Sequence, residues 1–247
     1  LVRWVAQILT RSLGVNCQAE LAQVERCFQA RQAEALMEAG LGLRDPARFD
    51  LRGRLSFGED CVFDINVVVS GAVTLGRQVS VGPNCQIIDS EIGDGVEIRG
   101  NSVVEGVKIA DHCAIGPFAR LRPGTVLNAG ARVGNFVETK NTTLGEDSKA
   151  NHLAYVGDAT VGQRVNIGAG VITCNYDGAN KHPTVIDDDA FIGSNSALVA
   201  PVTVGKGATV GAGSAVSRDV PPGQLALTRA EQQVRSGWQR PKKEKKT

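Results

Sequence analysis

The feature that most constrains the fold is an aliphatic residue that recurs every six positions. The longest series are Ile186, Ile192, Leu198, Val204, Val210 and Val216, and, earlier, Ile109, Ile115, Leu121, Leu127 and Val133. A period of six matches neither the 3.6-residue period of a helical face nor the two-residue period of a half-buried strand. It predicts an all-β, triangular parallel β-helix of hexapeptide repeats. One short strand occupies each six residues, its aliphatic residue points inward, and the coils stack.

Composition agrees with a narrow core. The 247 residues include 29 glycines but only 4% aromatic residues, and small layers are better filled by Val, Ile, Leu and Ala than by rings. A net charge of +1 predicts neither nucleic-acid nor membrane binding, and there is no apolar run long enough for a transmembrane helix. The six cysteines form no C-x-x-C pair, so free thiols in a reducing, cytoplasmic compartment are expected.

Three segments are expected: an N-terminal helical arm (1–42), the β-helix (43–220) and a C-terminal extension with a basic tail (221–247). Apolar residues fall near one face over residues 18–39, which predicts a helix, and a short helix is expected over 228–236.

The six-residue period is broken most at two places. These are the step from Val133 to Leu144 and the stretch from Cys174 to Val185. Both are predicted to be loops that leave the scaffold, where functional residues tend to lie.

Several longer motifs are more specific than the repeat. They are DPARFDLRG (45–53), IGPFARLRPG (115–124), VGNFVE (133–138), NIGAG (166–170), TCNYDGANK (173–181) and GWQRP (237–241). The chain resembles, from about Gly14 to its tail, the C-terminal acetyltransferase half of the bacterial bifunctional GlmU family. The family's uridylyltransferase domain, with its magnesium, has no counterpart in the sequence, so no metal is expected.

The resemblance implies a left-handed β-helix and a glucosamine-1-phosphate N-acetyltransferase that uses acetyl-CoA as co-substrate. The product would feed the synthesis of UDP-N-acetylglucosamine and the cell envelope. The resemblance also implies a homotrimer whose active sites lie between subunits. Neither nucleic acid nor membrane is an expected partner.

The resemblance also implies roles for individual residues. Of the three histidines, His152 lies in the segment KANHLAYVGD (149–158), which is similar to the family segment that carries the catalytic base. An imidazole that titrates near neutrality suits the removal of a proton from an amine. Glu138 is expected to orient this imidazole.

The remaining predicted site residues bind the two substrates. Arg122, Lys140, Tyr155 and Asn166 match the family's sugar-phosphate contacts, although Asn166 is also compatible with a role in satisfying the coil backbone. Ala169, Asn175, Tyr176, Ser194, Ala212 and Arg229 match the acetyl-CoA contacts, and Lys181 is a weaker candidate.

Three alternatives stay open from the repeat alone. The first is a hexapeptide acyltransferase with another acceptor, such as serine, a sugar nucleotide or a xenobiotic. The second is a zinc hydro-lyase similar to γ-class carbonic anhydrase, which requires a closely spaced H-x4-H pair. The histidines here lie forty and thirty positions apart, at 112, 152 and 182, which argues against it. The third is a non-catalytic β-solenoid.

Overall fold

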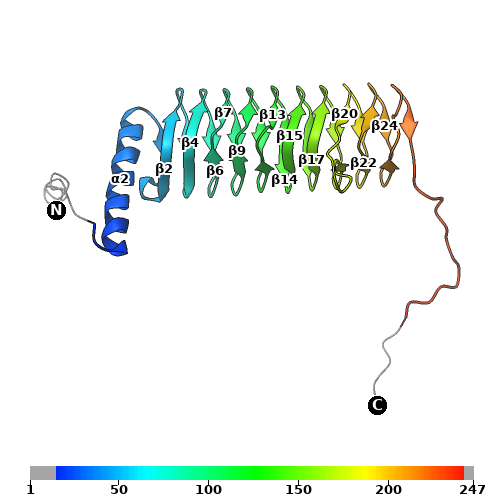
Figure 1. Ribbon diagram of the computed structural model, residues 1–247, viewed down its shortest axis with the longest axis horizontal. Coiled ribbons are helices and arrows are strands. Elements are labelled where there is room, and N and C mark those ends of the chain that lie inside the picture. Colours follow the sequence, from blue (N-terminus) through cyan, green and yellow to red (C-terminus); the bar gives the residue numbers. More distant parts are fainter. Residues whose placement is uncertain (1–14, 242–247) are drawn as a thin grey trace, which may run out of the picture.

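The computed structural model describes residues 15–241, which form a long parallel β-helix with one helix across its first coil (Figure 1). The predicted parallel β-helix of stacked coils is confirmed. Every pairing between named strands is parallel, and the strands form an 11-stranded and a 15-stranded sheet. The larger sheet covers two sides of the triangular prism, because its long strands bend around the corner between these sides.

We call the 11-stranded sheet face one. Its strands are β1 (Gly42–Leu43), β3 (Val62–Phe63), β5 (Ser80–Val81), β8 (Glu97–Ile98), β11 (Ala114–Ile115), β14 (Arg132–Asn135), β16 (Lys149–His152), β18 (Asn166–Ile167), β21 (Phe191–Ile192), β24 (Thr209–Val210) and β26 (Leu225–Ala226).

Faces two and three share the larger sheet. Face two holds β6 (Gln86–Ile88), β9 (Val103–Glu105), β12 (Arg120–Leu121), β19 (Ile172–Cys174), β22 (Ala197–Val199) and β25 (Ala215–Val216). Face three holds β7 (Glu91–Ile92), β10 (Lys108–Ile109), β13 (Val126–Leu127), β20 (Thr184–Ile186) and β23 (Val202–Val204). The long strands β2 (Phe49–Ser56), β4 (Val67–Leu75), β15 (Glu138–Leu144) and β17 (Tyr155–Val161) run along both.

The inward aliphatic residues form the core, as the six-residue period predicts. Ile115, Leu121 and Leu127, one on each side of a single coil, are all fully buried. Equivalent residues of successive coils are register partners, so that Ile98, Ile115 and Val133 stack on one another. Each layer is therefore closed by aliphatic contact above and below as well as within the coil.

Three cysteines also point into the prism. Cys61, Cys85 and Cys113 are buried, and burial raises the pKa of their thiols, that of Cys113 to about 11. A thiol with so high a pKa is a poor nucleophile at neutral pH, so these side chains act as small core residues.

One of the two predicted loops is absent. Between Val133 and Leu144 the chain continues as β14 and β15, and the prediction of an excursion there is wrong. The inward position is filled by Thr139, which is buried and whose hydroxyl lies 3.0 Å from that of Thr125. The hydrogen bond between the two hydroxyls satisfies both groups inside the prism. Thr139 therefore continues the six-residue repeat, although a search for aliphatic residues alone misses it.

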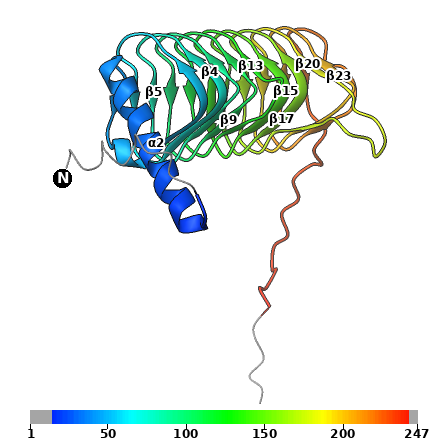
Figure 2. The ribbon, with the colours of Figure 1, turned by 60° about the vertical axis from the view of Figure 1, so that its left-hand side comes forward.

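The second predicted loop is present. The chain leaves the scaffold after β19 and returns at β20, where Thr184 is the register partner of Ala159 (Figure 2). We call residues 175–183 the excursion loop. Its base is closed by a 2.8 Å hydrogen bond from the amide of His182 to the carbonyl of Asn175.

The predicted helix over 18–39 is confirmed as α2 (Gln18–Glu38), and a short 3-10 helix η1 (Pro46–Arg48) follows it. The helix caps the first coil through Gln29, which is buried. Its side-chain oxygen accepts a 2.8 Å bond from the amide of Leu51, and its nitrogen donates a 3.0 Å bond to the same residue's carbonyl. These bonds satisfy backbone groups at the open end of the sheet, which would otherwise be a free edge.

The C-terminal helix expected over 228–236 does not form. After β26 the chain runs out in an irregular conformation to residue 241 (Figure 1), and Val234 and Trp238 are 86% and 70% exposed. A nine-residue segment with no surface to pack against lacks the tertiary contacts that stabilise a short helix in water. Among residues 15–241, no helix has both the length and the apolarity needed to span a membrane.

Candidate functional site

The corner where face one turns into face two aligns four of the predicted site residues. His152, Ala169, Ser194 and Ala212 occupy the same position in four consecutive coils, two residues after the inward residue of face one. We call this row the corner column. Backbone bonds link the coils along it, such as the 2.8 Å bond from the amide of Gly213 to the carbonyl of Ser194. The column is thus a straight, rigid edge along the prism.

His152 ends β16, and its imidazole is exposed. Its Nδ1 lies 2.8 Å from Oδ1 of Asn135, the residue directly paired with it in β14. Because an amide oxygen only accepts hydrogen bonds, this contact places the imidazole proton on Nδ1. In the neutral form of the ring, Nε2 then carries the lone pair that a general base requires.

Within one chain, the contacts of residues 15–241 pair Glu138 with Arg122 and His152 with Asn135, so an orienting role for Glu138 stays a prediction. Glu138 lies on face two, where its Oε1 accepts a 2.7 Å hydrogen bond from Nη1 of Arg122. This bond raises the pKa of the Arg122 guanidinium. Asn135 is the residue that holds the imidazole, and it was not among the predicted site residues.

A hollow of about 540 Å³ adjoins His152 on face one. Gly116 and Gly134 are among its lining residues. Its other lining residues are mostly polar or basic: Arg99, His112, Arg132, Asn135, Asn151 and His152, with Ala114 and Pro117. The space beside the imidazole therefore favours a polar or anionic ligand.

A cluster of cations lies on face two. Lys140 follows Glu138 in β15, and the positive charge of Lys181, which reaches it from the excursion loop, lowers its pKa; Arg122 adds to this effect. Tyr155 is the register partner of Glu138. Like charges held together in this way are stabilised by an anion, and phosphate is the anion that Arg and Lys commonly bind.

Asn166 is the exception among the predicted sugar-phosphate residues. It lies in β18 on face one, between the register partners Lys149 and Phe191, whereas Arg122, Lys140 and Tyr155 belong to face two. One chain therefore presents the four residues on two different faces of the prism.

The excursion loop contains two of the predicted acetyl-CoA residues and orders itself. The Asp177 carboxylate accepts bonds from the amides of Ala179 (2.8 Å) and Asn180 (2.7 Å) and pairs with Nε2 of His182 at 2.7 Å. These contacts, the amide of Asn180 first among them, hold the pKa of Asp177 far below its ordinary value. Tyr176 is exposed, and its backbone pairs with that of Lys181 on the returning side of the loop.

The other loop residue, Asn175, is only 8% exposed. Arg229, from the segment after β26, returns to the corner column and donates a 3.2 Å bond from Nη1 to the carbonyl of Ala212. The predicted residues thus form two groups in one chain. One is the corner column with Arg229, and the other is the cation cluster with the excursion loop.

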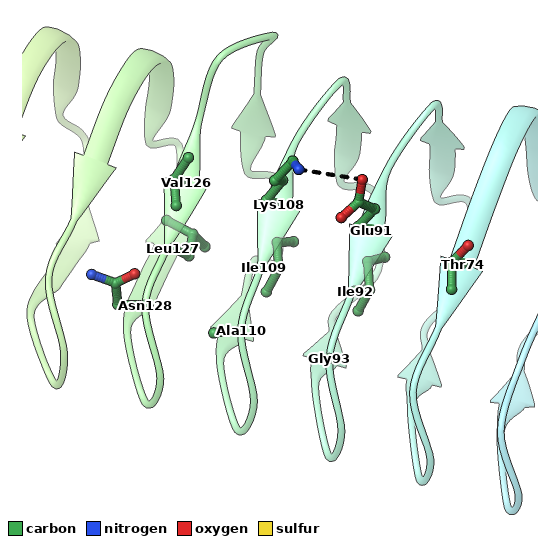
Figure 3. A pocket seen from close by; sticks show the side chains of 10 residues that line it. All are labelled: Thr74, Glu91, Ile92, Gly93, Lys108, Ile109, Ala110, Val126, Leu127 and Asn128. Atoms are coloured by element: carbon green, nitrogen blue, oxygen red, sulfur yellow. Dashed lines mark ion pairs between the residues drawn. The ribbon is translucent and has the colours of Figure 1, made fainter.

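A separate hollow of about 490 Å³ lies on face three and contains none of the predicted site residues (Figure 3). Its floor is made of the buried Ile92, Ile109 and Leu127, and its rim carries the ion pair between Lys108 and Glu91 at 3.4 Å. No histidine or cysteine lines it. The predicted catalytic residue, His152, thus lies outside this hollow.

Metal-ligating side chains do not gather into groups of three or more within residues 15–241. His112 and His152 line the same hollow, while His182 is paired with Asp177 in the excursion loop. The three histidines thus do not converge on one point.

Comparison with protein families agrees with the hexapeptide repeat. Residues 183–218 match the family model described as "Hexapeptide repeat of succinyl-transferase". A solved UDP-N-acetylglucosamine acyltransferase from Campylobacter jejuni is a more distant likeness, with 18% identity, 75% of this chain and 71% of that chain covered, and a TM-score of 0.43.

Two curated relatives are much more similar. The bifunctional protein GlmU of Marinobacter nauticus is 56% identical over 230 residues, and that of Pseudoalteromonas atlantica is 57% identical over 230 residues. Each match covers 93% of this chain and 51% of the relative, so the chain spans about half the length of the curated relatives it matches. With this identity over nearly its whole length, and with its hexapeptide repeats, the chain belongs to the GlmU family, as a form of its C-terminal acetyltransferase domain.

Proposed function

We propose that this chain transfers the acetyl group of acetyl-CoA to the amine of glucosamine-1-phosphate, with His152 as the general base. The observation that carries the proposal is the free Nε2 of His152 at the head of the corner column, with Nδ1 held by Asn135. The GlmU relatives support the substrate pair, and the cation cluster of Arg122, Lys140 and Lys181 suits a sugar phosphate.

The proposed reaction needs one proton acceptor. Nε2 of His152 takes a proton from the substrate nitrogen as its lone pair attacks the thioester carbonyl carbon, and a C–N bond forms. The tetrahedral intermediate then collapses, the C–S bond breaks, and the thiolate of coenzyme A receives the proton. Tyr155 and Asn166 would contact the sugar phosphate. Asn175, Tyr176 and Arg229, together with the corner-column residues Ala169, Ser194 and Ala212, would hold acetyl-CoA.

A homotrimer with active sites between subunits is part of the proposal. Asn166 lies on face one and the other three sugar-phosphate residues belong to face two, so one small substrate reaches all four only if faces of two copies meet. Closed symmetric assembly is the usual arrangement for such complementary faces. We further propose a cytoplasmic protein whose product enters UDP-N-acetylglucosamine and cell-envelope synthesis.

The test is thiol release from acetyl-CoA by the purified chain. Glucosamine-1-phosphate is the acceptor, and glucosamine-6-phosphate, serine and buffer are the controls. We expect turnover only with glucosamine-1-phosphate, and its loss by about two to four orders of magnitude in His152→Ala. His112→Ala is a matched control, because this histidine lines the same hollow without the Asn135 contact. No turnover by the folded chain, or equal turnover in His152→Ala, would contradict the proposal.

A further inference from the structure

A row of three polar side chains crosses the corner between faces two and three, behind the cation cluster. Nδ2 of Asn141 donates a 2.7 Å bond to Oδ1 of Asp158, and Nδ2 of Asn175 donates to Oδ2 of the same carboxylate. The three residues lie in consecutive coils, 17 positions apart. We call this row the amide ladder. Both oxygens of Asp158 are held by amides rather than by a cation.

The amide ladder connects the excursion loop with the cation cluster. Asn175 is the residue at which the chain leaves β19 for the excursion loop, and it is nearly buried. At the other end, Asn141 directly follows Lys140, and the negative charge of Asp158 partly offsets the effect of Lys181 and Arg122 on the pKa of the Lys140 ammonium. A single carboxylate thus acts on both the loop and the cation cluster.

The loop has few other anchors. Its base is closed by the bond between His182 and Asn175, and further bonds are made within the loop by Asp177 and by the hydroxyl of Tyr176. Lys181 also reaches the scaffold at Lys140, but two like charges do not hold the loop in place. A hollow of about 370 Å³ separates Lys181 and His182 from the scaffold at Asn141 and Asp158. Because this open space lies beneath the loop, the amide ladder is its main side-chain tie to the preceding coil.

We infer that Asp158 is a positioning residue that fixes the excursion loop through Asn175 and balances the charge of Lys140, so that both substrates bind. The inference rests on the proposed function for the identity of the substrates. It assigns to Asp158 no contact with the reacting atoms. We therefore expect removal of the Asp158 carboxylate to weaken the binding of both substrates rather than to slow the chemical step.

The variant Asp158→Asn tests this inference. The amide that replaces the carboxylate can accept from one neighbouring amide only, and its own NH2 group then faces the other. We expect the KM for acetyl-CoA to rise about tenfold and that for glucosamine-1-phosphate several-fold, because a charge-assisted hydrogen bond and a counter-charge are lost, while kcat stays within about threefold. Both KM values unchanged within about twofold would overturn the inference. Loss of folded protein alone would lower kcat and leave KM unchanged.

Rescue and control variants are available in the chain. The swap of Asn141→Asp with Asp158→Asn restores a complete amide ladder at the same net charge, because the new amide donates to the new carboxylate and accepts from Asn175. We expect the swap to return the KM for acetyl-CoA to within about threefold of the wild-type value.

Asp89→Asn is the matched control, since Asp89 lies at the same corner with a similar backbone (φ 43° against 48°) but binds only the amide of Ala72. Failure of the swap, or an equal effect of the control, would overturn the inference.

Hydrogen exchange separates this inference from the proposed function. We expect the amides of Ala179, Asn180 and His182 to exchange about tenfold faster in Asp158→Asn than in the wild type, and unchanged in Asp89→Asn. Faster exchange in a chain without acetyltransferase activity would support the anchoring role and refute only the proposed substrates. Unchanged exchange in an active enzyme would refute the anchoring role.

Discussion

The contact between Asn135 and His152 leads to the most quantitative prediction. Asn135→Ala removes the acceptor that places the proton on Nδ1 of His152. A hydrogen bond between neutral groups contributes about 0.5–1.5 kcal/mol, and this energy is what favours the productive tautomer and ring orientation. Because each 1.4 kcal/mol corresponds to about a factor of ten in rate, kcat should fall about two- to thirteen-fold. Both KM values should stay unchanged, because Asn135 is not among the substrate-binding residues.

The assay is thiol release measured at saturating substrates between about pH 5 and pH 9, which includes the range of about pH 5 to 8 in which an ordinary imidazole changes charge. A second variant, Asn135→Asp, keeps an acceptor at this position but adds a negative charge, which stabilises the imidazolium. We expect it to retain activity at high pH and to move the acid limb of the pH–rate profile upward. Asn84→Ala, which alters an amide contact at the same corner in an earlier coil, should leave the profile unchanged. An Asn135→Ala enzyme identical to wild type across the pH range would refute the tautomer argument.

Three further predictions concern the scaffold. A side chain at Gly134 would collide with the backbone of Asn151, so Gly134→Ala should lower the melting temperature and, by moving the neighbouring His152, reduce kcat as well. Leu127→Ala leaves a cavity in a fully buried layer and should cost about 2–5 kcal/mol in urea unfolding, with the slope unchanged. The pKa of Glu97 is lowered by its hydrogen bond from Arg99, so its stabilisation is complete above the unfolded pKa near 4.5 and is lost as the pH falls further. The difference in melting temperature between the wild type and Glu97→Gln should therefore shrink below about pH 4, and a difference that does not change with pH would contradict this.

The coils could be predicted because the inward position of each strand is read directly from side-chain polarity. The prediction failed at Thr139, which is polar but buried, because its hydroxyl is hydrogen-bonded to that of Thr125 inside the prism. It failed again over 228–236. A helical pattern indicates helix propensity, but it does not show whether the helix would have a protein surface to pack against. Both errors come from contacts that a one-dimensional pattern does not contain.

The partner of His152 was missed although the sequence held the signal for it. Register partners on face one lie 17 positions apart here, as Val133 and Ala150 do, so the residue stacked beneath His152 is Asn135. Glu138 lies 14 positions before His152 and therefore falls past the corner, on face two. Counting one coil length from a catalytic candidate is thus a more reliable guide to its neighbours than closeness within a motif.

The same counting explains why this scaffold suits a long, linear co-substrate. Residues one coil apart are separated by about 4.8 Å, so the three steps from His152 to Ala212 span on the order of 15 Å along one straight edge. Alanine and serine expose the backbone along this edge, and only its head carries an imidazole. The one enlarged coil, with 25 positions between Ile167 and Ile192, lies within this span and sends its extra residues out as the excursion loop. In the proposed site, a repeat built for stability gains its function through few residues: one histidine at a corner, its amide partner one coil earlier, and one insertion that we infer is held by Asp158.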